Sequence, residues 1–150
     1  MTDAGPHLVY GSCVALGGVA ALLQGSSASG KSDLALRFAL ETPAELGAAL
    51  VADDQVLIER DGARLIARPP STIAGRIEVR GLGIVTLPYL AEAELRLLVR
   101  LADDYADVPR LPRWDEESAT LCGLPLPVIA LAPFEASAPL KLRLALQRVA

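Results

Sequence analysis

Apolar and polar positions along the chain alternate in a way that predicts short strands and two helices. Residues 8–23 are apolar and carry Gly17-Gly18 near their middle, which predicts two buried strands joined at these glycines. Residues 32–41 predict a helix that ends before Pro43, because the residue that precedes a proline is pushed away from helical geometry. Residues 137–149 predict a second helix, since leucine and valine side chains recur near one face.

Strands are expected over most of the middle of the chain. Residues 48–52 form a short apolar run that ends at Asp53-Asp54, and residues 56–59 and 64–67 flank a turn at Asp61-Gly62. Residues 94–101 fit a buried strand or a helix, because a short apolar run does not reveal its period. The first pattern places the paired aspartates at the end of a strand, where α/β folds carry their chemistry.

The later segments differ in polarity. Residues 76–87 alternate like one strand that Gly81 and Gly83 interrupt. Residues 103–117 are polar and contain two prolines, which predicts a surface loop. Residues 121–132 are apolar and punctuated by prolines. With 150 residues, of which 52% are hydrophobic, we expect one domain with one core, occupying residues 1–150 without a separate N-terminal regulatory domain.

The charge and the cysteine content of the chain argue against several classes of protein. The net charge of −4 argues against nucleic acid as a partner, because neutralising phosphates needs clustered Lys and Arg. Cys13 and Cys122 lack the spacing of a zinc site and the density of a disulfide scaffold, so both are expected to be buried in a reducing cytosol. No basic residue precedes the apolar run at residues 8–23, and we therefore expect neither a signal peptide nor a membrane span.

A phosphate-binding loop is the strongest motif of the chain. Residues 25–32 fit the pattern G-x-x-x-x-G-K-[ST], between an apolar strand and a helix. Its members are Gly25, Ser26, Ser27, Ala28, Ser29, Gly30, Lys31 and Ser32. Backbone N–H groups and the helix dipole attract the phosphates, Lys31 neutralises their charge, and Ser32 offers a hydroxyl to Mg²⁺. The motif predicts binding of ATP with Mg²⁺ but does not separate a kinase from an ATPase or a GTPase.

The pair Asp53-Asp54 adds candidate acid–base chemistry. After a strand and downstream of a phosphate loop, one carboxylate can help to organise Mg²⁺ and the other can accept a proton from an attacking hydroxyl. An isolated Asp-Asp pair is more often a solvated turn. The apolar strand before the pair and the phosphate loop upstream favour the catalytic interpretation.

Three segments together resemble the HPr kinase/phosphorylase family, specifically its catalytic domain. Residues 25–33 are similar to the family loop G-x-S-G-x-G-K-S-[ED], residues 50–54 to its strand end L-[IV]-A-D-D, and residues 77–84 to its signature E-[IV]-R-G-[IL]-G-I. The order and spacing agree from about Tyr10 to the last helix. The resemblance implies an α/β fold with a P-loop kinase core, in which helices flank a mixed sheet.

The resemblance also implies roles for individual residues. Lys31 would stabilise the transferring phosphate, and Ser32 and Glu78 would help to hold Mg²⁺. Asp54 would accept the proton of a protein seryl hydroxyl, and would donate it when the reaction runs as phosphorolysis, with Asp53 as its support. The family uses an arginine from a mobile loop, for which Arg110 and Arg113 are candidates; we take Arg110 as the catalytic residue.

The implied activity is an ATP-dependent protein-serine kinase that modifies an HPr-like phosphocarrier and regulates carbon metabolism. The family's bifunctional phosphorylase activity, its cytoplasmic location and its homo-oligomeric, hexameric assembly are expectations of the same kind. Departures keep two alternatives open. Tyr10 stands where the family carries a histidine, Ala28 replaces a loop glycine, and the terminal region is short. The first alternative is an ATP-sensing module with weak or no phosphoryl transfer. The second is a P-loop kinase of a small molecule.

Overall fold

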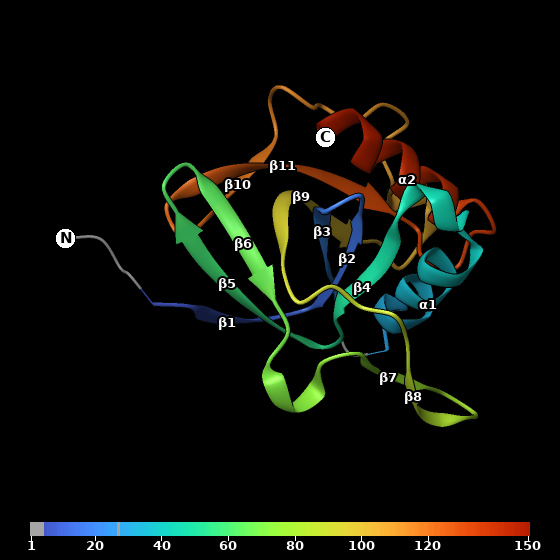
Figure 1. Ribbon diagram of the computed structural model, residues 1–150. Coiled ribbons are helices and arrows are strands. Elements are labelled where there is room, and N and C mark those ends of the chain that lie inside the picture. Colours follow the sequence, from blue (N-terminus) through green and yellow to red (C-terminus); the bar gives the residue numbers. More distant parts are fainter. Residues whose placement is uncertain (1–4, 27) are drawn as a thin grey trace.

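A nine-stranded sheet covered on one side by two helices forms the body of the molecule, as the computed structural model of residues 5–26 and 28–150 shows (Figure 1). The strands of this sheet are β1 (His7–Tyr10), β2 (Ser12–Leu16), β3 (Val19–Gln24), β4 (Ala48–Ala52), β5 (Gln55–Asp61), β6 (Arg64–Arg68), β9 (Ala93–Leu101), β10 (Ser118–Leu121) and β11 (Leu124–Leu131). Two further strands, β7 (Arg76–Val79) and β8 (Gly83–Thr86), form a separate hairpin. The helices are α1 (Lys31–Glu41) and α2 (Ala138–Val149), with short 3-10 turns at Ala44–Leu46, Ser71–Ile73 and Tyr105–Asp107.

The order of the strands brings several strand ends to one edge of the sheet. The order is β1-β5-β6-β9-β3-β2-β4, and β11 pairs with β9 beside β6. Strands β3, β9 and β11 run parallel, whereas β2 runs antiparallel to both β3 and β4. The carboxyl ends of β3, β9, β11 and β4 therefore lie at the same edge, together with the start of β2. This mixed sheet with flanking helices confirms the predicted fold class.

The predicted strands around Gly17-Gly18 are confirmed. Strands β2 and β3 pair from Ser12 opposite Leu23 to Leu16 opposite Val19. The two glycines between them have φ angles of 59° and 85°, which suits a two-residue hairpin turn because such turns need positive φ at both positions. The chain before Gly11 forms the additional strand β1, in which His7 lies opposite Ile58.

The prediction of one interrupted strand over residues 76–87 is wrong. This segment forms the β7–β8 hairpin, with Ile77 opposite Val85, and it projects from the body (Figure 1). Gly81 and Gly83 both have φ near 95°, a region that side chains with a Cβ rarely adopt. The glycines reverse the chain here instead of bulging a continuous strand. The turn between β5 and β6 also lies one residue later than expected, because Asp61 still pairs with Arg64.

The segment that the pattern left undecided is strand β9. It pairs with β3 along one edge and with β6 and β11 along the other. Its side chains pack into apolar clusters on both faces of the sheet, with Leu97 and Val99 in one and Leu95 and Leu98 in the other. A strand buried on both faces carries a nearly continuous apolar run and loses its alternation. This burial explains why the sequence pattern fitted a helix equally well.

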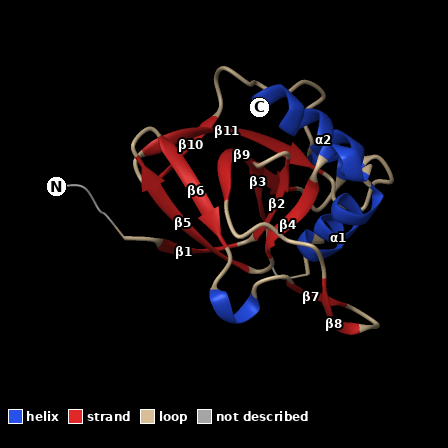
Figure 2. Ribbon diagram, viewed as in Figure 1, coloured by secondary structure: helices blue, strands red, loops and turns tan. Residues whose placement is uncertain are grey.

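Two apolar clusters fill the two faces of the sheet. Helices α1 and α2 lie on the same side (Figure 2) and bury Phe38 and Leu142 against Val99 and Leu131. The second cluster, which includes Cys13, Ile58 and Leu98, fills the other face. Burial raises the pKa of the Cys13 thiol above its usual value. The expectation of burial is thus confirmed for Cys13, whereas Cys122 is only half-buried.

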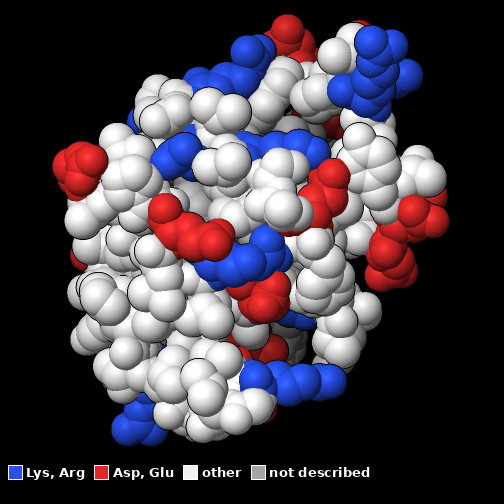
Figure 3. Space-filling view, turned by 90° about the vertical axis from the view of Figure 1, so that its right-hand side faces the viewer, with Lys and Arg blue, Asp and Glu red and all other residues white. Residues whose placement is uncertain are grey.

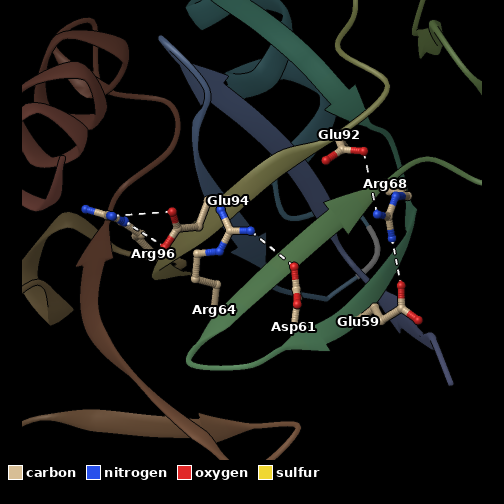
Figure 4. A network of polar contacts seen from close by, with 7 residues as sticks. All are labelled: Glu59, Asp61, Arg64, Arg68, Glu92, Glu94 and Arg96. Carbon is tan, nitrogen blue, oxygen red and sulfur yellow. Dashed lines mark hydrogen bonds and ion pairs between the residues drawn. The ribbon is translucent and has the colours of Figure 1, made fainter. Parts of the chain in front are cut away.

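A network of ion pairs lies at the amino-terminal end of β9, away from the edge described above (Figure 4). Arg68 lies between Glu59, at 2.9 Å, and Glu92, at 3.6 Å. Arg96 pairs with Glu94 at 3.0 Å and donates to the carbonyl of Val149 at 3.0 Å. Because partly exposed ion pairs each contribute less than about 1 kcal/mol, the main effect of this network is to align β5, β6, β9 and the end of α2.

Candidate functional site

The predicted phosphate-binding loop connects β3 to α1 at the edge where the parallel strands end. Gly30 precedes the helix with φ 97°, and no side chain caps the helix N-terminus. The first N–H groups of a helix lack partners within it, so an uncapped N-terminus presents donors and a positive dipole end to an anion. Of the predicted loop residues, Ser27 lies outside the described residues.

The Lys31 ammonium group closes the loop onto itself. Its Nζ donates to the carbonyl oxygens of Gly25 and Ser26, both at 2.8 Å. A phosphate entering the loop offers Lys31 oxygen acceptors that carry negative charge, and hydrogen bonds to charged acceptors are roughly twice as strong as those to neutral ones. The Lys31 side chain therefore lies against the loop, and its binding to phosphate stays a prediction.

Ser29 and Ala28 give this loop two unusual features. The Ser29 side chain is buried, and its hydroxyl has no hydrogen-bond partner among the described residues. Ala28 has a φ of 64°, a left-handed conformation that costs an alanine roughly 1 to 2 kcal/mol. The sequence identified Ala28 as the replacement of a family glycine, and the structure shows that the backbone keeps the geometry that a glycine would favour.

Asp53 is the centre of a small polar cluster beside the loop. Its side chain is buried, and one carboxylate oxygen, Oδ1, accepts from the hydroxyls of Ser12 and Ser32 at 2.8 Å each. Ser12 comes from the start of β2, Ser32 from the first turn of α1 and Asp53 from the end of β4. The cluster thus ties Asp53 to the first turn of α1, and the roles that the resemblance implies for Asp53 and Ser32 stay predictions.

Asp54 differs from Asp53 in the exposure and the hydrogen bonding of its side chain. Its side chain is exposed and makes no hydrogen bond or ion pair with any part of the chain that the structure describes. Its φ is 68°, and its carbonyl accepts from the Gly11 N–H at 2.9 Å. This turn directs one aspartate inward and leaves the next one available to solvent.

Tyr10 lies beside the same turn. It ends β1, opposite Gln55, and its side chain is 68% exposed. The position at which the resemblance implies a histidine therefore adjoins Asp54. His7, in contrast, is half-buried within β1.

Glu78 lies on the β7–β8 hairpin. Its neighbour Ile77 packs in the same cluster as Leu34 and Phe38 of α1, which fixes the hairpin beside that helix. Glu78 points to the opposite side of β7, is exposed, and has no polar partner among residues 5–26 and 28–150. The structure places it on the α1 side of the molecule without joining it to the Asp53 cluster.

The arginine candidates lie in the loop that follows β9. Arg110 and Arg113 both line a cavity of about 650 Å³ between this loop, β11 and α2. The other cationic residues that line it are Arg100, Lys141 and Arg148. Arg113 pairs with Glu116 at 3.8 Å, whereas Arg110 has no ion pair in the described part of the chain. Figure 3 shows Lys and Arg side chains over the whole of this face, several of them in the upper part of the view and interspersed with Asp and Glu.

The donor atoms at this edge suit magnesium but do not form a complete site by themselves. Mg²⁺ prefers oxygen ligands and usually combines one or two carboxylates with substrate phosphates and water. Ser32 and Asp53 provide such oxygens 2.8 Å apart. Within the described residues, no group of three or more His, Cys, Asp or Glu side chains could hold a metal alone. These residues therefore fit a metal that arrives with a nucleotide.

Two functional features escaped the sequence analysis. Ser12 was treated only as part of an apolar run, although its hydroxyl donates to Asp53. Arg37 joins the segment after β11 to α1, because its guanidinium donates to the carbonyls of Pro133 and Glu135. For Ser12, the sequence offers only a weak signal, a polar residue within an apolar run. For Arg37, no local pattern predicts the contacts with Pro133 and Glu135.

Comparisons with known proteins identify the family of this chain. The HPr kinase/phosphorylase of Chlorobium chlorochromatii is 35% identical over 135 residues, which cover 81% of this chain and 38% of that protein. The protein of the same name from Chlorobium limicola is 35% identical over 138 residues, covering 83% and 39% of the two chains. The chain thus spans about two fifths of the length of these curated relatives.

A solved structure has the same fold over nearly the whole chain. The Hpr(Ser) kinase/phosphatase from Coxiella burnetii superimposes with a TM-score of 0.78 at 20% identity, covering 95% of each chain. None of the helices in the described residues is long and apolar enough to cross a membrane. The family profile of the HPr Serine kinase C-terminal domain matches residues 4–130, and the chain therefore belongs to the HPr serine kinase C-terminal domain family.

Proposed function

We propose that this chain is an ATP-dependent protein-serine kinase that phosphorylates an HPr-like phosphocarrier in the bacterial cytoplasm. Membership of the family and the names of the curated relatives support the substrate class. One observation carries the catalytic part of the proposal. The Asp54 carboxylate is exposed and unpaired in the described structure, at the edge of the sheet that also holds the phosphate loop. A domain that only binds a nucleotide has no need of a free carboxylate there.

In the proposed reaction, Asp54 accepts the proton of the carrier's seryl hydroxyl. The seryl oxygen then forms a bond to the γ-phosphorus of ATP, and the bond between this phosphorus and the oxygen that bridges to the β-phosphate breaks. ADP leaves with the electron pair of that bond. Because the transition state of phosphoryl transfer is loose, positioned charge supplies most of the acceleration. Lys31 provides positive charge at the loop, and Asp53 holds Ser32 in place.

Magnesium fits the same arrangement. We propose that Ser32 and Glu78 help to hold the ion, with Asp53 next to Ser32. When bound, Mg²⁺ neutralises the charge on the β- and γ-phosphate oxygens. Lys31 turns from the Gly25 and Ser26 carbonyls to the phosphates in this scheme.

Arg110 is the arginine that we propose to act from the loop after β9. Arg113 is already paired with Glu116, whereas the Arg110 guanidinium has no carboxylate partner among the described residues. An unpaired arginine is available to stabilise charge on a transferring phosphoryl group.

A transfer assay with labelled ATP, Mg²⁺ and purified HPr-type carriers tests the proposal. We expect label on a carrier serine with the unmodified chain. The Asp54→Asn variant should retain its affinity for ATP and lose at least about 10²-fold in transfer, the usual scale for removing a proton-transfer group. Asp61→Asn, at an exposed aspartate that ends β5, is the matched control and should transfer normally.

Two outcomes would contradict the proposal in different ways. Tight binding of ATP without label on any carrier would favour a nucleotide-sensing module. Unchanged transfer by Asp54→Asn would show that Asp54 is not the base, even if the chain is a kinase.

A further inference from the structure

Phe134 is a large aromatic side chain that the fold leaves exposed. The chain has two phenylalanines; Phe38 is fully buried, whereas 70% of Phe134 is exposed. Phe134 lies in the segment after β11, at the same edge of the sheet as the phosphate loop. Single exposed apolar residues are common, so its surroundings decide whether this one has a function.

The Phe134 ring touches the phosphate-binding loop. A Cβ built on Gly30 would lie 2.9 Å from Cζ of the ring and 3.0 Å from the Pro133 side chain. Gly30 directly precedes Lys31 and the first turn of α1. The tip of the ring thus packs against the loop where phosphates are expected, while most of the ring remains open to solvent.

The backbone on both sides of Phe134 is held in place. Arg37 donates to the carbonyls of Pro133 and Glu135, the residues that flank the phenylalanine, and its own guanidinium pairs with Asp33 at 2.9 Å. The Glu135 carboxylate pairs with Lys141 of α2 at 2.8 Å. Three polar interactions therefore tie this short segment to both helices, and the Asp33 carboxylate holds the Arg37 side chain that makes two of them.

We propose that Phe134 stacks on the base of the nucleoside triphosphate whose phosphates bind in the loop. The inference rests on the proposed function, because it requires the loop to bind a nucleotide. A nucleotide with its phosphates at the N-terminus of α1 must extend its base beyond the loop. The exposed face of the Phe134 ring lies beside this loop, within reach of such a base. Every base has a π-face, so such a stack adds affinity for nucleotides without selecting one base. Phe134 is then a base-binding residue that takes no part in the chemical step.

Calorimetry with two ligands separates stacking from support of the loop. ATP and inorganic tripolyphosphate, each with Mg²⁺, carry the same chain of phosphates, but only ATP has a base. We expect Phe134→Ala to weaken ATP binding by about 5- to 100-fold, the fold-change that corresponds to one lost base–aromatic stack. Binding of tripolyphosphate should change by less than about twofold. Leu140→Ala, which shortens another exposed apolar side chain in the first turn of α2, is the matched control and should bind both ligands normally.

A tryptophan at the same position gives an independent readout. Phe134→Trp should bind ATP within about threefold of the unmodified chain, because an indole stacks at least as well as a phenyl ring. Its fluorescence, compared with that of the unmodified chain containing only Trp114, should be quenched by ATP and unaffected by tripolyphosphate.

The possible results also separate this inference from the proposed function. Equal losses for ATP and tripolyphosphate in Phe134→Ala would mean that the ring only supports the loop, and an unchanged ATP affinity would mean that it contacts no base. Either result overturns the role of Phe134 and leaves a nucleotide-binding kinase intact. If the unmodified chain bound neither ligand, the proposed function would fail and the inference with it.

Discussion

Removal of the Ser12 hydroxyl tests whether the Asp53 cluster holds the site together. Ser12 is fully buried, and its Oγ donates to Asp53 Oδ1 at 2.8 Å. A hydrogen bond to a charged group contributes about 1.5 to 3 kcal/mol. Because Asp53 retains the Ser32 hydroxyl, we expect Ser12→Ala to lower the free energy of unfolding by about 1.5 to 2 kcal/mol, the lower part of that range. For a domain of this size the midpoint of thermal unfolding should fall by about 3 to 8 °C.

Urea denaturation measures this loss directly. We expect the midpoint to fall while the dependence of the free energy on urea stays constant, because the surface exposed on unfolding does not change. Ser118→Ala, at an exposed serine of β10, should remain within about 0.5 kcal/mol of the unmodified chain. The Ser12→Ala and Ser32→Ala changes should also be non-additive, since both hydroxyls donate to the same oxygen. The reasoning would be refuted if Ser12→Ala and Ser118→Ala had equal stability.

Two further substitutions test the geometry of the phosphate loop. Ala28→Gly should raise the free energy of unfolding by about 0.5 to 1 kcal/mol, because relief of the left-handed conformation outweighs the added flexibility of the unfolded chain; a loss in urea denaturation would mean that the backbone at this position is not left-handed. Gly30→Ala should lower the free energy of unfolding by about 1 to 3 kcal/mol. The alanine would have to adopt a φ of 97°, and its Cβ would lie 2.9 Å from Phe134 and 3.0 Å from Pro133. The Gly30→Ala chain should also bind ATP more weakly in calorimetry, and normal stability together with normal binding would contradict the close approach.

The sequence predicted those parts of the candidate site that consist of residues adjacent in the chain. The phosphate loop is one contiguous motif, and its glycine at position 30 has the positive φ that the motif implies. Asp53-Asp54 could be placed at a strand end because residues 48–52 form an apolar run bounded by polar residues. The hairpin at Gly17-Gly18 was likewise predictable, since the glycines and both apolar strands are adjacent in the chain.

Other features depend on contacts between distant segments, which no local pattern reveals. Ser12 and Asp53 are 41 residues apart in sequence, and they meet only because β2 pairs with β4. Strand β9 packs against an apolar cluster on each face of the sheet, and residues from several distant parts of the chain form each cluster. Burial on both faces removes the alternation that identifies a strand. The β7–β8 hairpin was mistaken for a single strand because glycine permits either a bulge or a reversal, and tertiary packing decides between them.

The contrast between Asp53 and Asp54 shows how one turn gives two identical side chains different chemistry. Strand geometry directs Asp53 inward, where two hydroxyls hold its carboxylate and fix it beside the loop. The next residue adopts φ 68° because its carbonyl is bound by the Gly11 N–H at the β1–β2 junction, and this bend sends the Asp54 carboxylate into solvent. A buried, bonded carboxylate can position a neighbour but cannot readily meet a substrate, whereas an exposed one can accept a proton from an incoming hydroxyl. The different surroundings of the two aspartates therefore follow from the path of the backbone and from the strand pairing that fixes it, and the proposed division of labour depends on them.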